Sequence, residues 1–91
     1  RHYSDIFYYK TTSSKEIDFV VLNSQGDLQL YQSCLDLSSE KTKIREISAL
    51  IEAANELKAT ALYIITLDEE DEIMENGNTI KLIPFWKWAG Q

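Results

Sequence analysis

Residues 15–34 are predicted to form a β-hairpin, and this hairpin restricts the fold more than any other stretch of the chain. Its two halves, 15–22 and 28–34, contain the Val, Ile, Phe and Tyr residues that favour a half-buried strand. The loop between them reads Asn-Ser-Gln-Gly-Asp, a composition typical of a tight turn. The sequence therefore predicts two antiparallel strands at the centre of a sheet.

The register of this hairpin determines which side chains share a face. The expected cross-strand pairs are Leu22 with Leu28, Val20 with Leu30, Asp18 with Gln32, and Glu16 with Cys34. Because side chains alternate along a strand, these eight residues are expected on one face. Asp18 is an acid within an apolar strand, and together with Gln32 it could contact one ligand, since Cβ atoms of paired residues lie roughly 4.5–5.5 Å apart. A slip of one residue would turn Gln32 to the other face.

The hydrophobic period changes from two to about 3.6 residues after Asp36, which predicts one long helix over 39–58. Ser38 or Ser39 would cap its start, and Glu40 suits the positive end of the helix dipole. The apolar stripe expected to cover the sheet consists of Ile44, Ile47, Leu50, Ile51, Ala54 and Leu57. The residues expected to face mostly solvent are Lys43, Arg45, Glu46, Glu52 and Glu56.

The segments on either side complete a mixed sheet. An aromatic strand is expected over 5–12, so the first three strands form an antiparallel meander. The apolar run at 60–67 predicts a buried strand. It is expected to run parallel to the strand that ends at Cys34, because a right-handed crossover through the helix connects the two strands. An edge strand is expected at 79–83, with 72–74 as its hairpin partner, and 85–88 as a final helical turn. The predicted fold class is α/β, bordering on α+β.

Length and composition define the kind of protein. The 91 residues, 44% hydrophobic and 26% charged, predict one globular domain over 1–91. The sequence has no initiator Met, so we expect a C-terminal fragment of a longer chain. One cysteine suits a reducing cytoplasm, and no apolar run reaches the ~18–20 residues that cross a membrane. The net charge of −6 disfavours general nucleic-acid binding.

Six short motifs follow one another along the chain. They are Phe7-Tyr8-Tyr9-Lys10, Lys15-Glu-Ile-Asp-Phe-Val-Val21, Asp36-Leu-Ser38, Lys43-Ile-Arg-Glu-Ile47, Tyr63-Ile-Ile-Thr66 and Ile83-Pro-Phe-Trp-Lys-Trp88. Taken in this order, they resemble the C-terminal domain of a prokaryotic AAA-type ATPase family, and the resemblance covers nearly the whole chain. That domain is of uncharacterised function and is similar to the PD-(D/E)xK nuclease, or restriction-endonuclease-like, fold.

The resemblance implies a nuclease site that has lost its chemistry. Active members of that superfamily carry an acid on one strand and acid-x-lysine on the next, where the acids hold a Mg²⁺-like ion and the lysine stabilises developing charge. Asp18 matches the first acid, whereas the acid-x-lysine motif falls on Gln32 and Cys34. Gln32 supplies a neutral oxygen in place of the acid, and Cys34 supplies no cation in place of the lysine. We therefore expect no catalytic residue and no cofactor in this chain. The expected function is a non-catalytic interaction or regulatory domain that contacts its own ATPase domain or a partner protein.

The alternative is a metal-dependent nuclease domain acting on DNA or RNA. Under this alternative Mg²⁺ would bind at Asp18, with Glu16 as a second candidate ligand. Lys10 or Lys15, on neighbouring strands, would then replace the missing motif lysine.

Overall fold

The first three strands form the predicted antiparallel meander in a computed structural model, which describes residues 5–90. Their bounds are β1 Asp5–Lys10, β2 Glu16–Leu22 and β3 Leu28–Ser33. The central hairpin has the expected register near its loop, where Leu22 pairs with Leu28 and Val20 with Leu30. No helix in the described part of the chain is both long and apolar enough to cross a membrane.

The helix α1, Glu40–Leu57, confirms the predicted long helix and is the main helix of the fold. Ser39 is its N-cap, with the side chain accepting a hydrogen bond from the backbone N–H of Thr42 at 3.3 Å. Lys58, with φ of 60°, adopts the left-handed conformation that ends the helix. The strand β4, Ala61–Thr66, then pairs with β3 in parallel, as the change of period at Asp36 predicts.

The C-terminal part of the sheet differs from the prediction. The strand β6, Asn78–Pro84, pairs in parallel with β4, so it lies inside the sheet rather than at the edge. The edge is β5, Asp71–Glu75, joined to β6 by the Asn76-Gly77 turn, where both residues have positive φ. Ile80 and Leu82 of β6 are buried, which fits the position of this strand inside the sheet.

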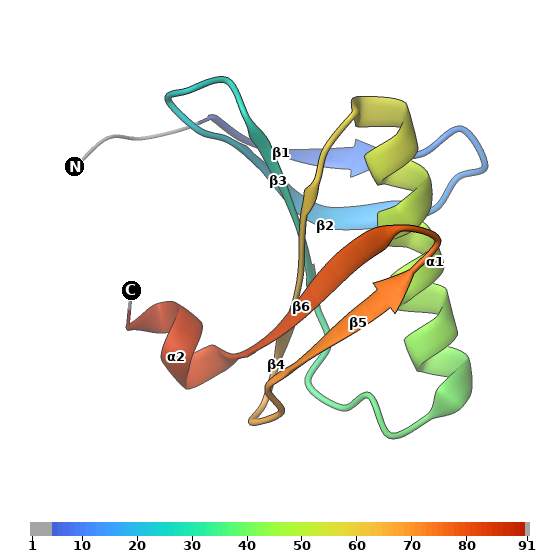
Figure 1. The fold of residues 1–91 in the computed structure, drawn as a ribbon, viewed down its shortest axis with the longest axis vertical. Coiled ribbons are helices and arrows are strands. Elements are labelled where there is room, and N and C mark those ends of the chain that lie inside the picture. Colours follow the sequence, from blue (N-terminus) through green and yellow to red (C-terminus); the bar gives the residue numbers. More distant parts are fainter. Residues whose placement is uncertain (1–4, 91) are drawn as a thin grey trace.

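The sheet has six strands in the order β1-β2-β3-β4-β6-β5, and the short helix α2, Phe85–Ala89, follows it. Figure 1 shows α1 and α2 on opposite sides of this sheet. The architecture is therefore a mixed α+β sheet with one main helix, which is compatible with the predicted class.

The buried face of α1 overlaps the predicted stripe but is rotated toward its alanines. Its buried residues are Ala49, Leu50, Ala53 and Ala54, of which Leu50 and Ala54 belong to the predicted stripe. Ile47, Ile51 and Leu57 are partly buried and pack against the core, whereas Ile44 is 58% exposed. Small alanine side chains let the helix lie close to the sheet, whereas sequence periodicity gives more weight to the larger isoleucines. Glu46 and Glu52, expected in solvent, are consequently half-buried.

A bulge in β2 breaks the expected alternation. β1 pairs Tyr9 with Ile17 and Phe7 with Val20, so β2 carries one additional residue over this interval. Ile17 and Val20 are therefore both buried on the α1 side of the sheet. The paired residues of β2 and β3 extend only to Phe19 and Tyr31, and the predicted pairs that begin at Asp18 and Glu16 do not continue the ladder.

One side of the sheet faces α2, and we call this side the open face. It carries a row of aromatic rings. Phe19 and Tyr31 stack with ring centroids 4.9 Å apart, and Tyr31 and Tyr63 stack at 4.8 Å. Trp88 of α2 contacts this row, with its ring 6.2 Å from that of Phe19. Trp86 is instead exposed to solvent, so α2 attaches to the open face through Trp88.

Candidate functional site

Three of the four predicted site residues line one small pocket between the sheet and the first half of α1. We call this the Asp18 pocket, and its volume is about 360 Å³. It is lined by Ser14, Lys15, Glu16, Asp18, Gln32, Arg45, Glu46 and Ala49. The structure thus brings Asp18, Gln32 and Glu16 to one pocket, although the regular β2–β3 ladder ends at Phe19 and Tyr31.

Gln32 is buried in this pocket, with 2% of its surface exposed, and its amide joins the two strands. The side-chain oxygen accepts a hydrogen bond from the backbone N–H of Asp18 at 2.9 Å. The side-chain nitrogen donates to the backbone carbonyl of Glu16 at 3.1 Å. A side chain therefore satisfies backbone groups of β2 beyond the end of the β2–β3 ladder, and both ends of the amide are occupied.

Asp18 completes the same connection from the other strand. Its Oδ2 accepts a hydrogen bond from the backbone N–H of Ser33 at 2.7 Å, a short distance typical of a charged acceptor. The carboxylate remains exposed on its other side. Asp18 and Gln32 thus hold β2 to β3 through side chains at the point where backbone pairing stops.

Cys34 does not line the Asp18 pocket, although it is part of the predicted motif. Its Sγ donates a hydrogen bond to the backbone carbonyl of Asp36 at 3.4 Å, and its backbone N–H donates to Ile65. Burial raises the pKa of the Cys34 thiol, which keeps it protonated at neutral pH. A neutral thiol supplies neither the positive charge of the motif lysine nor a reactive thiolate.

The helix contributes two pocket residues that sequence reasoning placed in solvent. Burial raises the pKa of Glu46, the adjacent Arg45 guanidinium lowers it, and the carboxylate of Asp18 raises it further. Arg45 lies 3.4 Å from the Glu46 carboxylate. The rotated helix face is what turns Glu46 toward the sheet. The sequence signal for this rotation is the pair Ala49 and Ala53, which lie three and seven residues after Glu46 on the same side of the helix and are buried.

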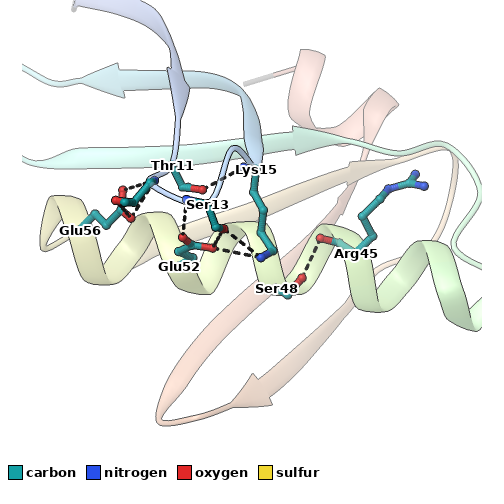
Figure 2. A network of polar contacts seen from close by, with 8 residues as sticks. Thr11, Ser13, Lys15, Arg45, Ser48, Glu52 and Glu56 are labelled. Carbon is teal, nitrogen blue, oxygen red and sulfur yellow. Dashed lines mark hydrogen bonds and ion pairs between the residues drawn. The ribbon is translucent and has the colours of Figure 1, made fainter.

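Lys15, the proposed substitute for the motif lysine, is already paired. Its Nζ lies 3.1 Å from Oε1 of Glu52 and donates to the hydroxyl oxygen of Ser13, also at 3.1 Å. Figure 2 shows this network, in which Glu52 and Glu56 of α1 reach the loop between β1 and β2. Lys10 does not line the pocket and pairs through its backbone with Glu16.

The same network sets the ionisation of the helix acids. Hydrogen bonds from Ser13, helped by Lys15, lower the pKa of Glu52 from 4.5 to about 2. Hydrogen bonds from Thr12 and Tyr9 likewise lower the pKa of Glu56. Both acids are therefore ionised at neutral pH and hold the β1–β2 loop against the helix.

The pocket residues do not fit a Mg²⁺ ion in their present positions. Mg²⁺ requires several oxygen ligands in octahedral geometry. One oxygen of Asp18 accepts from Ser33, and the side-chain oxygen of Gln32 accepts from Asp18. Over residues 5–90, no group of three or more His, Cys, Asp or Glu side chains is placed to hold a metal ion.

Two other hollows lie away from these residues. One of about 720 Å³ is on the open face and includes Tyr31, Tyr63 and Lys81. The other, about 510 Å³, runs between α1 and β5 and includes Ile44 and Ile73. Both have a larger volume than the Asp18 pocket, and neither is lined by a predicted site residue.

Comparison with known proteins finds a distant relative. The chain is 33% identical over 91 residues to the uncharacterized protein MJ1544 of Methanocaldococcus jannaschii, an alignment that covers 93% of this chain. The chain spans only 20% of the length of that relative. No family model matches the sequence, and no solved structure matches it significantly.

Proposed function

We propose that this chain is a non-catalytic interaction or regulatory domain, a restriction-endonuclease-like module that has lost its nuclease chemistry. The observation that carries the proposal is the set of hydrogen bonds that the side chains of Asp18 and Gln32 make. Both side chains are engaged in hydrogen bonds that join β2 to β3, so the positions that match the nuclease motif serve the fold. A fold can persist after its chemistry is lost, since its strands still build the core.

The charges around the pocket support the same proposal. Hydrolysis of a phosphodiester needs positive charge near the developing negative charge, and removal of one such stabilising group typically costs about 10²–10³ in rate. Cys34 is neutral and points to Asp36, and Lys15 is paired with Glu52. The free charge at the pocket is therefore carried mainly by carboxylates, which repel a polyanion.

The parent protein is proposed to be a cytoplasmic AAA-type ATPase. The support is the resemblance of the ordered motifs, the lone cysteine, and a relative about five times as long as the aligned segment. In this setting the domain contacts its own ATPase domain or a partner protein, and it needs no cofactor of its own.

A cleavage assay tests the proposal against catalysis. The 91-residue chain is incubated with single-stranded DNA, duplex DNA and RNA in the presence of Mg²⁺ or Mn²⁺, beside Asp18→Asn, which keeps an acceptor oxygen for Ser33. We expect no divalent-dependent cleavage by either protein. Cleavage by the unchanged chain that disappears in Asp18→Asn would contradict the proposal.

A second experiment tests the regulatory role directly. In the full-length polypeptide, deletion of this domain is expected to change the rate of ATP hydrolysis or the state of subunit assembly. Asp18→Asn is expected to leave both unchanged, because the domain still folds. No effect of the deletion on either property would contradict a regulatory role.

The metal-dependent nuclease is the second candidate, favoured by one observation. Glu16, Asp18 and Glu46 line the same pocket, although the three are not placed to hold a metal ion together. Under this candidate the Asp18–Ser33 bond must break for both oxygens of Asp18 to bind an ion. The cleavage assay with Asp18→Asn decides between the two candidates.

A further inference from the structure

Three adjacent parallel strands, β3, β4 and β6, have their carboxyl ends on the same side of the sheet, and an exposed apolar side chain lies within two residues of each end. Thr66 pairs with Pro84, so Leu67 and Phe85 occupy the next position of neighbouring strands. The backbone N–H of Leu67 donates to the carbonyl of Leu35 at 3.3 Å, which places Leu35 beside Leu67. Trp86 follows Phe85 in α2. We call Leu35, Leu67, Phe85 and Trp86 the carboxyl-end patch.

The exposure of these four side chains is high for their size. Leu35 and Leu67 are each 59% exposed, Phe85 is 51% exposed and Trp86 is 64% exposed. Single exposed apolar residues are ordinary, whereas a row of them across adjacent strands is typical of a binding surface. Each such side chain could gain roughly 25 cal/mol for every Å² of apolar surface that a partner removes from water. The patch therefore has favourable free energy available for binding.

The row also adjoins the open face of the sheet. Tyr31 pairs with Tyr63 and Ser33 with Ile65, and Leu35 and Leu67 lie just beyond the ends of these two strands. Phe85, the first residue of α2 after β6, lies with its ring 6.2 Å from that of Trp88, which itself packs on the aromatic row. The exposed patch thus adjoins aromatic side chains that are already packed. Little conformational entropy of these neighbouring side chains would be lost when a partner binds.

The charges that flank the patch are negative. Asp36 follows Leu35 and is exposed, with a pKa lowered by hydrogen bonds from Ser38, so it is ionised at neutral pH. Asp68 and Glu69 follow Leu67 and are also exposed. The neighbouring cation, Lys87, is paired with Glu70. The patch is therefore an apolar row with an acidic rim.

We propose that the carboxyl-end patch binds a partner-protein segment whose apolar or aromatic side chains are flanked by lysine or arginine. Opposite charges at the rim would orient such a segment and speed its association, while the apolar row would supply most of the affinity. A second copy of this chain would bring two acidic rims together, and an anionic membrane would be repelled. The proposal rests on the proposed interaction function and names its surface and the chemistry of its partner.

A binding measurement with model peptides tests this proposal. The probe is a fluorescent amphipathic peptide of leucine and lysine with one tryptophan, and the matched control peptide has glutamate in place of lysine. We expect the 91-residue chain to bind the lysine peptide and not the glutamate peptide. Raising the salt concentration from about 0.1 to about 1 M, which shortens the screening length from roughly 10 to 3 Å, should weaken the binding.

Matched variants locate the site. The double change Leu67→Ser and Phe85→Ser is expected to weaken peptide binding about tenfold or more, because both anchors of the row are removed. Asp68→Asn with Glu69→Gln should weaken it about threefold, mainly through slower association. Ile44→Ser is the control, since Ile44 is equally exposed but lies on α1, and it should leave binding unchanged. Circular dichroism melting curves confirm that each variant is folded.

Several results would overturn the patch assignment. Equal losses in Ile44→Ser and in the double variant would do so, as would equal binding of the two peptides. Concentration-dependent dimerisation that the double variant abolishes would assign the patch to self-association, and patch-dependent binding to phosphatidylserine vesicles would assign it to a membrane. If the peptide fails to bind while deletion of the domain still alters ATP hydrolysis in the full-length polypeptide, the patch proposal fails and the proposed function stands.

Discussion

The Asp18 pocket and the carboxyl-end patch differ in how fully their groups are used. In the pocket, Asp18 and Gln32 complete a connection between two strands, and the buried amide has both of its ends bonded. In the patch, Leu67 and Phe85 present more than half of their surface to water. The residues that suggest nuclease chemistry thus make hydrogen bonds within the fold, while the carboxyl-end patch leaves apolar side chains exposed to solvent.

This difference shows why residue identity alone is a poor guide to the site. An acid and an amide on neighbouring strands suggest ligand binding, yet here their hydrogen bonds join β2 to β3 beyond the end of the backbone ladder. Exposed leucines at strand ends suggest nothing in the sequence, yet the parallel pairing brings them together. The comparison between these regions leads to four predictions.

The largest effect is expected for Gln32→Leu. Leucine fills a similar volume but leaves the N–H of Asp18 and the carbonyl of Glu16 without their partner, which should lower the free energy of unfolding by about 2–4 kcal/mol. Gln29→Leu is the control on the same strand, because Gln29 is only partly buried, and it should change stability by less than about 0.5 kcal/mol. Urea denaturation measures both. Equal losses in the two variants would remove the structural role assigned to Gln32.

A smaller loss is expected for Asp18→Ala. The variant removes the acceptor for the N–H of Ser33, but Ser33 is exposed and water can replace the bond, so we expect a loss of about 1 kcal/mol. Asp18→Asn keeps an acceptor oxygen and should lose less than about half of that amount. The same urea measurement applies. An increase in stability in either variant would show that Asp18 is a strained functional acid and not a structural one.

The fold was largely predictable where the signals are local. The serine cap at 39, the apolar run of β4 and the hairpin of 72–74 with 79–83 are local signals, and all three are confirmed. The inner position of β6 was missed because strand order depends on long-range pairing, which a short apolar segment does not reveal. The rotation of α1 was missed because Ala49 and Ala53 carry a weak hydrophobic signal but permit the closest approach to the sheet.

The candidate site was predictable in its members and not in its geometry. Asp18, Gln32 and Glu16 do line one pocket, but the expected register ends at Phe19 and Tyr31, and Cys34 lies outside the pocket. The bulge, which separates Ile17 from Val20, has no clear signal in a strand of regular composition, so its hydrogen bonds could not be predicted. Glu46 and Arg45 enter the pocket only because the helix is rotated, a consequence of tertiary packing.

A third prediction concerns the rim of the Asp18 pocket, where Glu52 holds Lys15. The folded-state pKa of Glu52 is depressed from 4.5 to about 2, so its ionised form stabilises the protein fully above pH 4.5. That contribution should be lost progressively as the pH falls from 4.5 through about 2. Glu52→Gln should therefore be less stable than the unchanged chain at pH 7 and approach it near pH 2.

Urea denaturation at a series of pH values measures this difference. Glu75→Gln, at an exposed position on β5, is the control and should follow the unchanged chain throughout. A constant difference between Glu52→Gln and the unchanged chain across the range would show that the network does not depend on ionised Glu52.

The smallest effect on stability is expected for Leu67→Ser. Because Leu67 is exposed, its replacement should change the free energy of unfolding by less than about 0.5 kcal/mol, while binding of the lysine peptide weakens. The contrast with Gln32→Leu sharpens the comparison, since one change should affect stability and the other binding. A loss above about 1.5 kcal/mol for Leu67→Ser would mean that the patch is part of the core.

The central claim is that Asp18 serves the fold through its bond to Ser33, and the backbone amide of Ser33 reports on that bond directly. Nuclear magnetic resonance follows this amide while MgCl₂ is added to the 91-residue chain, with the amide of Gln29 on the same strand as the reference. We predict that the Ser33 resonance moves no more than the Gln29 resonance, because the carboxylate stays bonded to the backbone. A saturating shift of the Ser33 amide alone, lost in Asp18→Asn, would show that Asp18 releases its partner to bind a metal ion and would contradict the account.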